Sequence, residues 1–535
     1  MVIDPRLTDT AATFADEWLP LRPTTDAALF VAMAYVLITE GLCDHDFLDR
    51  YCVGFDEQHL PAGVPAGSSF EWYVLGRSDG VPKTPEWASG PTGIDANAIR
   101  NLARQYALLR PAQLLQGLGP QRQAHGEESV RAGIALACMT GNLGVPGGGW
   151  GGGEGVRRLG IPVSGLPTGV NPVKARIPVF LWTDAVVRGT GMTAADGVEN
   201  GPLASNIKFI FNLGSNALLN QHADVNRTAR ILADESLLEF IVVSDQFLTP
   251  SARFADLVLP ADHSLERADI GVPWSGERYI VFGNKVAEPP SECRHDYWWL
   301  SRVAERLGVG EAFTEGKTEE EWLRQIVRDA RQADPQFPSY EELSEKGVYR
   351  KDPEEYVAFE KEIRDPAAHP FPTPSGKIEI FSRTLYNMQR ADIPAVPQYI
   401  PAWEGPEDAS ASRYPLQCIG PHSKRRTHST WDEDPWMEEA EPQEMWISPA
   451  DAAARGIGQG DRVKVFNDRG ALLARARVTR RIRPGVVAIP QGAWYTPGKD
   501  GVCRRGCINV LTSQRPTPLA HGNAQHTIRV EAQRV

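Results

Sequence analysis

Apolar residues recur at helical spacing in the first third of the chain. Between residues 25 and 40 they fall three or four positions apart, which predicts a buried helix that ends at Gly41. A second helix is predicted to begin after Asp95 and to end before Pro111, and a third in the stretch ESVRAGIALACM. Short apolar runs such as AQLLQG separate these helices, so the pattern indicates a parallel α/β layer.

The alternation of strand and helix starts again after residue 200. IKFIFNLGSN predicts a strand with a glycine-rich turn, DVNRTARILADE a helix, FIVVSDQFL a second strand and ARFADLVLPAD a loop and a third. This is a βαβ pattern with polar residues at the carboxyl ends of its strands, where open parallel sheets bind ligands. From residue 334 to 403, prolines and acidic residues predict surface loops and a crossover.

Beyond Tyr414 the pattern changes to two-residue alternation. DRVKVFNDRGALLARARVT predicts two strands joined by a turn at residues 468–470, and GVVAIPQG predicts a third strand. The last part of the chain is therefore predicted to be a separate β-barrel.

Length and charge narrow the classes of protein. The 535 residues suggest roughly three domains, and 42% apolar with 23% charged residues is typical of a globular protein. The net charge of −12 argues against a general nucleic-acid or anionic-membrane surface. No apolar run approaches the roughly 18 residues that span a bilayer, so no direct membrane span is expected.

The seven cysteines are scattered, without the close pairs or four-residue cluster of a zinc or iron–sulfur site. We expect ordinary thiols and assign no metal ligand.

A glycine-rich run, TGNLGVPGGGWGGGEG, follows the third predicted helix at residues 140–155. A P-loop is disfavoured because the run follows a helix, and a free linker because it contains Val145, Pro146 and Trp150. Close approach of the backbone remains, either to another segment or to a ligand.

Polar turns follow three of the predicted strands. A strand-end Asp can accept from a sugar hydroxyl or a guanine edge, while Arg and backbone N–H groups bind pyrophosphate. Each turn alone is more often a helix cap or a satisfied turn, but the repetition favours a nucleotide-like ligand. These candidates are Asp4, Pro5 and Arg6, then Gly214, Ser215 and Asn216, and then Ser244 and Asp245.

The β-rich part adds further polar candidates. His428 beside Ser429 has no nucleophile elbow or orienting acid around it, so hydrogen bonding to a polar ligand fits better than hydrolysis. A heterocycle with a mixed donor and acceptor edge suits the amides near the end of the chain, although loop pinning is the simpler alternative. The candidates are Arg426, His428, Ser429, Asn509 and Asn523.

Together these motifs resemble the catalytic A subunits of anaerobic dimethyl sulfoxide reductases, in the molybdopterin oxidoreductase family, over essentially the whole chain. The landmarks are VIDPRLTDTA, DGVPKTPEWA, GLGPQRQAHGE, MTGNLGVPGGG, NQHADVNRT, ADLVLPA, TPSGKIEI, RTHST, QEMWISPADAAARGI, VFNDRG and GCINVLTSQRPTPLAHGN. The resemblance implies an α/β fold with two parallel-sheet, dinucleotide-binding-like domains and a carboxyl-terminal six-stranded-type β-barrel. It places the domains at residues 1–145, 146–400 and 401–535.

The resemblance also implies the cofactor, bis(molybdopterin guanine dinucleotide) with molybdenum. Its contacts are expected at the candidates already named and, by resemblance alone, at Gly117, Gly119, Gln121 and Arg122. The family's [4Fe–4S] motif, molybdenum-ligating serine and export signal are expected upstream of VIDPR. By this resemblance we expect the chain to be a fragment of a longer reading frame, one part of a split enzyme, or a scaffold.

The implied activity is molybdenum-dependent reduction of S-oxides and N-oxides, such as dimethyl sulfoxide to dimethyl sulfide, in anaerobic respiration by oxygen-atom transfer to Mo(IV). An iron–sulfur B subunit and a membrane anchor are the expected partners, on the periplasmic side of the membrane. The alternatives are a related reductase of selenate, thiosulfate, tetrathionate or polysulfide, and a non-catalytic scaffold like the large iron–sulfur subunit of respiratory complex I.

Overall fold

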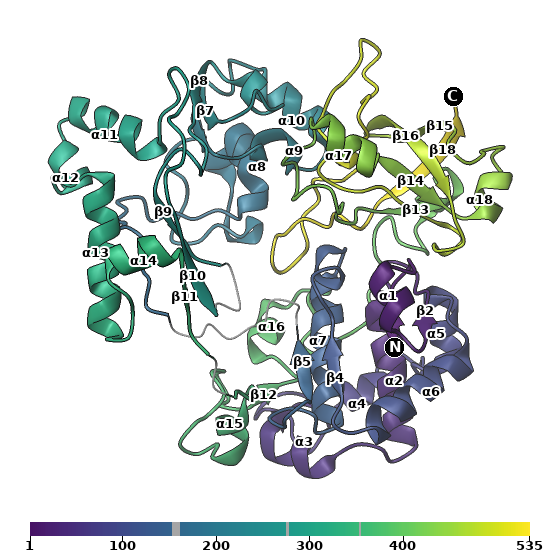
Figure 1. Cartoon of the computed structure of the whole chain (residues 1–535). Coiled ribbons are helices and arrows are strands. Elements are labelled where there is room, and N and C mark those ends of the chain that lie inside the picture. Colours follow the sequence, from purple (N-terminus) through teal and green to yellow (C-terminus); the bar gives the residue numbers. More distant parts are fainter. Residues whose placement is uncertain (152–160, 274–277, 353–354) are drawn as a thin grey trace.

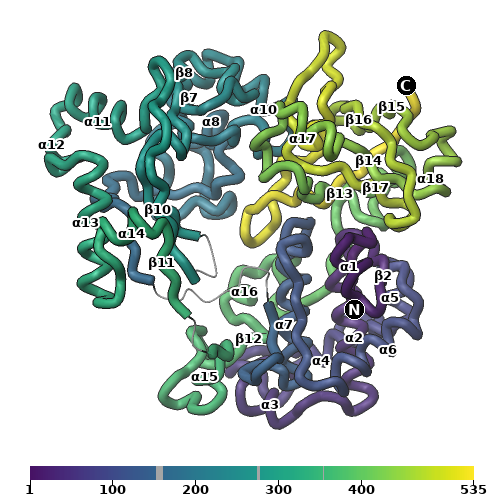
Figure 2. The backbone as a smooth tube through the Cα atoms, in the orientation of Figure 1, coloured from purple at the N-terminus to yellow at the C-terminus, as the bar shows by residue number. Residues whose placement is uncertain are grey.

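Three bodies make up the chain in a computed structural model that describes residues 1–151, 161–273, 278–352 and 355–535 (Figure 1). The helical body contains residues 1–151 together with residues 360–396. The sheet body contains residues 177–350, and the barrel contains residues 414–535. Figure 2 shows the same arrangement as a backbone tube, with the barrel beside both other bodies.

The helical body is built around α2 (Asp26–Thr39), whose residues are buried almost all round, as predicted. Helices α5, α6 and α7 pack on it, and Asp95 caps α6 by accepting from the backbone N–H groups of Asn97 and Ala98. Its parallel strand pairs are only two or three residues long: β1 with β2, β3 with β12, and β4 with β5. The elements are β1 Val2–Ile3, α1 Asp9–Phe14, β2 Trp18–Leu19, α3 His45–Tyr51, β3 Cys52–Val53, α4 Phe70–Val74, α5 Pro85–Thr92, α6 Ala96–Leu108, β4 Gln113–Leu115, η1 Pro120–Arg122, α7 Gly126–Met139 and β5 Gly149–Gly151.

The glycine-rich run passes close to other segments of the chain. A Cβ on Gly148 would lie 2.5 Å from the carbonyl oxygen of Asn142, and one on Gly144 would lie 2.6 Å from a side-chain carbon of Ile363. Of the three interpretations, close backbone approach therefore holds for the first part of the run, with the chain itself as the neighbour. The rest of the run, residues 152–155, lies outside the described residues.

The sheet body contains the predicted βαβ unit. Strands β6, β7 and β8 form a parallel sheet, as the apolar pattern predicts, and they lie in the order β6-β7-β8. A second, antiparallel sheet has the order β11-β10-β9. The elements are η2 Val179–Leu181, α8 Trp182–Arg188, η3 Gly189–Gly191, η4 Ala194–Asp196, β6 Phe209–Leu213, α9 Ala217–Asn220, α10 Val225–Leu232, β7 Phe240–Asp245, η5 Ala252–Phe254, β8 Leu257–Pro260, β9 Asp269–Gly271, β10 Tyr279–Gly283, α11 Asp296–Arg306, α12 Gly310–Thr314, α13 Glu319–Ala333, α14 Tyr340–Lys346 and β11 Val348–Arg350.

Residues 334–403 are more than the predicted surface loops. Phe337 and Leu343 are buried in the sheet body, and Phe371, Ile380 and Phe381 are buried in the core of the helical body. The prediction missed this packing because burial of isolated apolar residues among prolines leaves no periodic signal. The elements of the returning segment are α15 Glu360–Arg364, β12 Ile378–Glu379 and α16 Arg383–Met388.

The barrel is closed and six-stranded, in the order β13-β17-β14-β16-β15-β18. Strands β15 and β16 pair antiparallel from Arg462 opposite Arg475 to Asn467 opposite Gly470, which places the turn where the sequence predicts it. Its core is continuous with that of the sheet body, since Val225 and Ile241 share one apolar cluster with Val463. The elements are η6 Ala409–Ser412, β13 Leu416–Ile419, α17 Pro435–Ala440, β14 Glu444–Ile447, α18 Pro449–Ala453, β15 Arg462–Asn467, β16 Gly470–Val478, β17 Val486–Ala488, η7 Ile508–Val510 and β18 Arg529–Arg534.

All seven cysteines are free thiols, and five of them are buried. In the described part of the chain, no helix is both long and apolar enough to cross a membrane.

Candidate functional site

The first predicted turn joins the helical body to the barrel. The Arg6 backbone N–H donates to Asp4 Oδ1 at 2.7 Å, and the Pro5 carbonyl accepts from the backbone N–H of Arg483 at 2.9 Å. Burial raises the pKa of Asp4 and lowers that of Arg6, while each partly offsets the shift of the other. The turn thus places a desolvated charge pair beside the barrel.

Three histidines and two glutamines form a polar group that we call the histidine cluster: His422, His428, Gln491, Gln525 and His526. The Gln491 side-chain nitrogen lies 2.9 Å from Nε2 of His422 and 3.4 Å from Nδ1 of His428. Gln525 links Gln491 to His526 at 3.4 Å on each side. Of these five residues, the sequence pattern indicated only His428.

The predicted segment 117–122 lies against this cluster. The backbone N–H of His526 donates to the Arg122 carbonyl at 3.1 Å, and the backbone N–H of Ala124 donates to the Thr527 hydroxyl at 2.8 Å. Burial, then the positive charges of Arg122 and Arg6, and then His422 lower the pKa of His526 to about 3. The fold therefore brings the predicted Arg6, Arg122 and His428 into one neighbourhood.

Gly117 and Gly119 flank an open part of this neighbourhood. Gly117 has a φ of +61°, and a Cβ on either glycine would have no described atom within 4 Å. Gln121 is exposed beside them on η1. These glycines serve no close packing among the described residues, and they leave backbone accessible to a ligand.

The turn after β6 joins the sheet body to the barrel. Asn216 donates to the Ser429 hydroxyl at 3.3 Å and accepts from the Ser251 hydroxyl at 2.8 Å. The Gly214 backbone N–H donates to the Ser244 carbonyl at 2.8 Å, and the Ser215 carbonyl accepts from Asn212. Asn216 and Ser429, predicted from separate motifs, are therefore neighbours.

Ser244 and Asp245 end β7 with different surroundings. The Ser244 hydroxyl is buried and donates to Asp296 at 2.5 Å, so it already has a partner at the start of α11. Asp245 accepts from the backbone N–H of Gln246 at 2.8 Å, and burial raises the pKa of its carboxyl. Asp245 is thus the better placed of the two to accept from a ligand.

The Arg426 side chain bonds to other residues of the barrel. Its side chain is fully buried, where it pairs with Asp432 at 2.8 Å and donates to Gln443 at 2.7 Å and to the Gln491 carbonyl at 2.9 Å. Burial lowers the pKa of Arg426 to about 10. This residue holds the loop that carries His428 instead of facing the open space.

The two predicted asparagines near the end of the chain differ in their bonding. Asn509 donates to the Asn220 carbonyl at 2.7 Å and accepts from the Thr512 hydroxyl at 3.3 Å. The side-chain oxygen of Asn523 is buried without a hydrogen-bond partner among the described residues. Asn509 therefore ties the barrel to α9, whereas Asn523 offers a free acceptor.

The donor set fits a large polar ligand. Buried side-chain atoms that find no partner in the described part of the chain include Nε of Arg6 and the amide oxygens of Gln514 and Asn523. An orphaned buried polar atom costs about 1–3 kcal/mol, and a ligand with matching groups removes that cost. Arginine with backbone N–H groups suits a pyrophosphate, and the amides suit a heterocycle.

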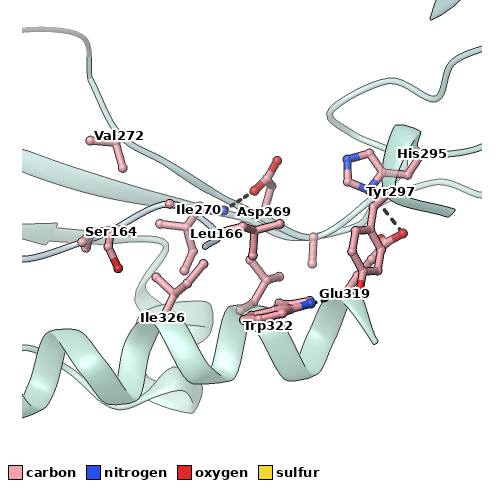
Figure 3. A pocket seen from close by; sticks show the side chains of 14 residues that line it. Ser164, Leu166, Asp269, Ile270, Val272, His295, Tyr297, Glu319, Trp322 and Ile326 are labelled. Carbon is pink, nitrogen blue, oxygen red and sulfur yellow. Dashed lines mark hydrogen bonds and ion pairs between the residues drawn. The ribbon is translucent and has the colours of Figure 1, made fainter. Parts of the chain in front are cut away.

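A cavity of about 240 Å³ lies elsewhere, in the sheet body between β9 and α13 (Figure 3). Its walls are mainly apolar, including Ile270, Trp322 and Ile326, and the His295 ring lies 3.2 Å from Glu319 at one end. None of the predicted contact residues is among the described residues that line it. We therefore place the candidate site at the meeting of the three bodies.

One group of potential metal ligands occurs in the described residues of the helical body, formed by Asp49, Asp56 and His59. The His59 ring nitrogen bonds Asp56 Oδ1 at 2.8 Å, and the same oxygen accepts from two backbone N–H groups. Asp56 and His59 are therefore already bonded to each other, and Asp49 lies 3.7 Å from the same ring nitrogen.

Comparison with known proteins gives the family. Residues 1–306 match the molybdopterin oxidoreductase family, and residues 416–529 match the molybdopterin dinucleotide-binding domain. The chain belongs to the molybdopterin oxidoreductase family. The second match covers Arg426, His428, Ser429, Asn509 and Asn523, while the first covers the other predicted contacts.

Named relatives agree with this membership. The chain is 46% identical to dimethyl sulfoxide reductase DmsA of Haemophilus influenzae and of Escherichia coli, over 100% of this chain and 68% and 67% of theirs. It is 35% identical to a dimethyl sulfoxide/trimethylamine N-oxide reductase of Cereibacter sphaeroides, over 99% of this chain and 66% of the other. Acetylene hydratase from Pelobacter acetylenicus shares the fold with a TM-score of 0.71 at 24% identity, over 100% of this chain and 73% of that one.

Proposed function

We propose that this chain is the cofactor-binding part of a molybdenum-dependent reductase of S-oxides and N-oxides, with dimethyl sulfoxide as the first substrate to test. The observation that carries the proposal is 46% identity over the whole chain to two dimethyl sulfoxide reductases. The relatives of lower identity that are named for both dimethyl sulfoxide and trimethylamine N-oxide support the inclusion of N-oxides.

The cofactor in this proposal is bis(molybdopterin guanine dinucleotide). When bound, it supplies oxygen-atom transfer between the oxide and the reduced metal. One dinucleotide is held at the turn after β6 by Asn216 and Ser429, with Asp245 accepting from its sugar or guanine. The other is held beside the histidine cluster, where Arg6 and Arg122 attract its pyrophosphate.

The chain contributes binding, orientation and a controlled electrostatic field. Burial lowers the pKa values of His422 and His526, so both imidazoles are neutral at neutral pH. Each accepts a hydrogen bond within the protein, His422 from the Gln491 side chain at 2.9 Å and His526 from the Gly420 backbone N–H at 3.3 Å. The two rings are thus held in place beside the site without adding positive charge. Arg426 and Asn509 keep their loops in place around the site.

We further propose that a [4Fe–4S] cluster belongs to a segment upstream of this chain, and that electrons arrive through an iron–sulfur B subunit from a membrane anchor on the periplasmic side. The identity to the DmsA proteins supports an assembly of this kind. Co-purification of the full-length subunits with metal analysis tests it.

The substrate is tested with holoenzyme that contains this chain, assayed with reduced viologen against dimethyl sulfoxide, trimethylamine N-oxide and selenate. We expect turnover of the S-oxide and the N-oxide and none of selenate. Holoenzyme loaded with molybdenum that turned over selenate but no S-oxide would overturn the proposal.

A further inference from the structure

A polar groove of about 620 Å³ lies on the barrel, and four arginines line it. We call it the arginine groove. Arg462 comes from β15, Arg475 from β16, and Arg504 and Arg505 from the loop before η7. Glu438 of α17 lines it as well. None of the four arginines belongs to the candidate cofactor site.

The arginines of the groove are only partly neutralised. Arg504 pairs with Asp500 at 2.6 Å and Arg505 with Asp432 at 3.0 Å. Arg462 and Arg475 are both exposed, and neither has a carboxylate within 4 Å among the residues that the structure describes. Glu438, the acidic residue of the groove, already forms an ion pair with Arg425 at 2.5 Å.

The two unpaired arginines face each other across the ladder. Arg462 and Arg475 are direct cross-strand partners in the antiparallel pairing of β15 with β16. Side chains directly opposite project from the same face, and like charges there are destabilising. The strand on the other side of Arg475 offers Glu444, but that carboxylate pairs with Arg477 at 3.5 Å. The repulsion between the two guanidiniums is therefore not offset by a carboxylate of the described residues, and an anionic group of a binding partner can offset it.

The wall behind the groove is also rich in positive charge. Asp432 is shared by Arg425, Arg426 and Arg505. Nε and Nη1 of Arg425 are buried, and neither has a hydrogen-bond partner in the described part of the chain. The groove is thus a local excess of positive charge on a chain whose net charge is −12.

We propose that the arginine groove is a docking site for an acidic segment of a partner polypeptide, whose carboxylates meet Arg462 and Arg475. Arginine binds a carboxylate with two parallel N–H···O bonds, and the pair of guanidiniums offers two such sites side by side. The groove is open and draws its cations from three segments, which suits a chain with spaced carboxylates better than one compact anion. The negative charge over the rest of the surface repels such a segment and so fixes where it docks.

The test measures binding of a fluorescein-labelled hexaglutamate peptide to the chain by fluorescence anisotropy at low ionic strength. We expect the R462Q/R475Q double variant to bind about tenfold more weakly, since two partly desolvated ion pairs are lost. The R306Q/R328Q variant removes two exposed arginines of α11 and α13 and serves as the charge-matched control, with affinity close to that of the unchanged chain. R462K/R475K should retain part of the binding and shows that the groove is intact.

Equal affinity of R462Q/R475Q and R306Q/R328Q for the peptide would overturn the proposal, because attraction would then be general. Binding of inorganic pyrophosphate to the groove, without peptide binding, would also overturn it and assign the groove to a small anion. Both results are independent of the proposed reductase activity, since viologen-linked turnover by holoenzyme should be the same in R462Q/R475Q as in the unchanged protein.

Discussion

Nη1 of Arg426 lies 2.8 Å from Oδ1 of Asp432, and both side chains are completely buried. The second carboxylate oxygen of Asp432 accepts from the Trp494 backbone N–H at 2.8 Å and from Arg505 at 3.0 Å. This carboxylate thus connects the loop that carries His428 and Ser429 to two other segments of the barrel. Asp432 therefore positions this loop, although its own side chain does not face the site.

Replacing Asp432 by Asn should destabilise the barrel strongly. The amide keeps the shape but leaves Arg426 buried without its counter-charge, and breaking a buried pair costs about 3 kcal/mol. For a body of this size we expect the apparent Tm to fall by roughly 5–10 °C, measured by calorimetry.

Asp392→Asn is the matched control, because its partner Arg390 lies 2.7 Å away on the surface. Exposed pairs contribute little, so its Tm should stay close to that of the unchanged protein. A D432N variant as stable as D392N would show that the buried cluster is not a stabilising element.

The histidine cluster should make stability depend on pH. The pKa of His526 is lowered to about 3 in the folded chain, chiefly by burial, whereas an unfolded histidine titrates near about 6.5. Between these values the unfolded chain binds one more proton than the folded chain, so stability falls as the pH falls, by at most about 1.4 kcal/mol per pH unit. Above the unfolded pKa the histidine contributes no pH dependence.

H526Q should remove this dependence. We expect the loss of unfolding free energy between about pH 7 and about pH 5 to be smaller in H526Q by about 2 kcal/mol, measured by urea unfolding. H369Q alters an exposed histidine and should keep the dependence of the unchanged chain. Identical pH profiles of H526Q and H369Q would contradict the lowered pKa.

Local periodicity predicts the elements of this fold better than their assembly. The buried helix α2, the Asp95 cap of α6 and the strands β6 to β8 all follow from short windows of sequence. The return of residues 360–396 to the helical body does not, because its contacts join segments about three hundred residues apart: the Tyr51 hydroxyl donates to the Ile363 carbonyl. Contacts of this range leave no mark on neighbouring positions.

The sequence predicted only part of the candidate site, because long-range contacts also build the rest of it. Strand ends and family motifs indicated Arg6, Asn216 and His428, and the fold brings these to the junction of the bodies. Three separate segments bring together His422, Gln491 and His526, so no local pattern indicated these residues. The predicted domain division and the individual cofactor contacts stay predictions.

The glycine-rich run gives a prediction about packing. A Cβ on Gly148 would lie 2.5 Å from the Asn142 carbonyl oxygen and 2.7 Å from a Val145 methyl, so Gly148→Ala should cost about 1–3 kcal/mol of stability. Gly191→Ala is the control, because a Cβ there would have no described atom within 4 Å.

We also expect the Gly147→Val/Gly148→Val variant of the full-length protein to have reduced cofactor loading, measured as molybdenum per chain. Unchanged loading would show that these glycines serve the turn alone.

Arg122 offers the sharpest test of the cofactor position. Its carbonyl accepts from the His526 backbone N–H at 3.1 Å, and the charge of its exposed side chain lowers the pKa values of His422 and His526. Replacing it by Gln in the full-length protein should reduce molybdenum and guanine per chain by about threefold to tenfold, because a charge-assisted contact to a phosphate is worth about 1 kcal/mol or more. The same variant should raise the pKa of His526, observed by NMR titration, which a merely structural role would not do. Arg104→Gln, which removes a surface partner of Glu40, should change neither quantity. Full cofactor content in R122Q together with a shifted His526 titration would place the arginine beside the cluster but away from the cofactor.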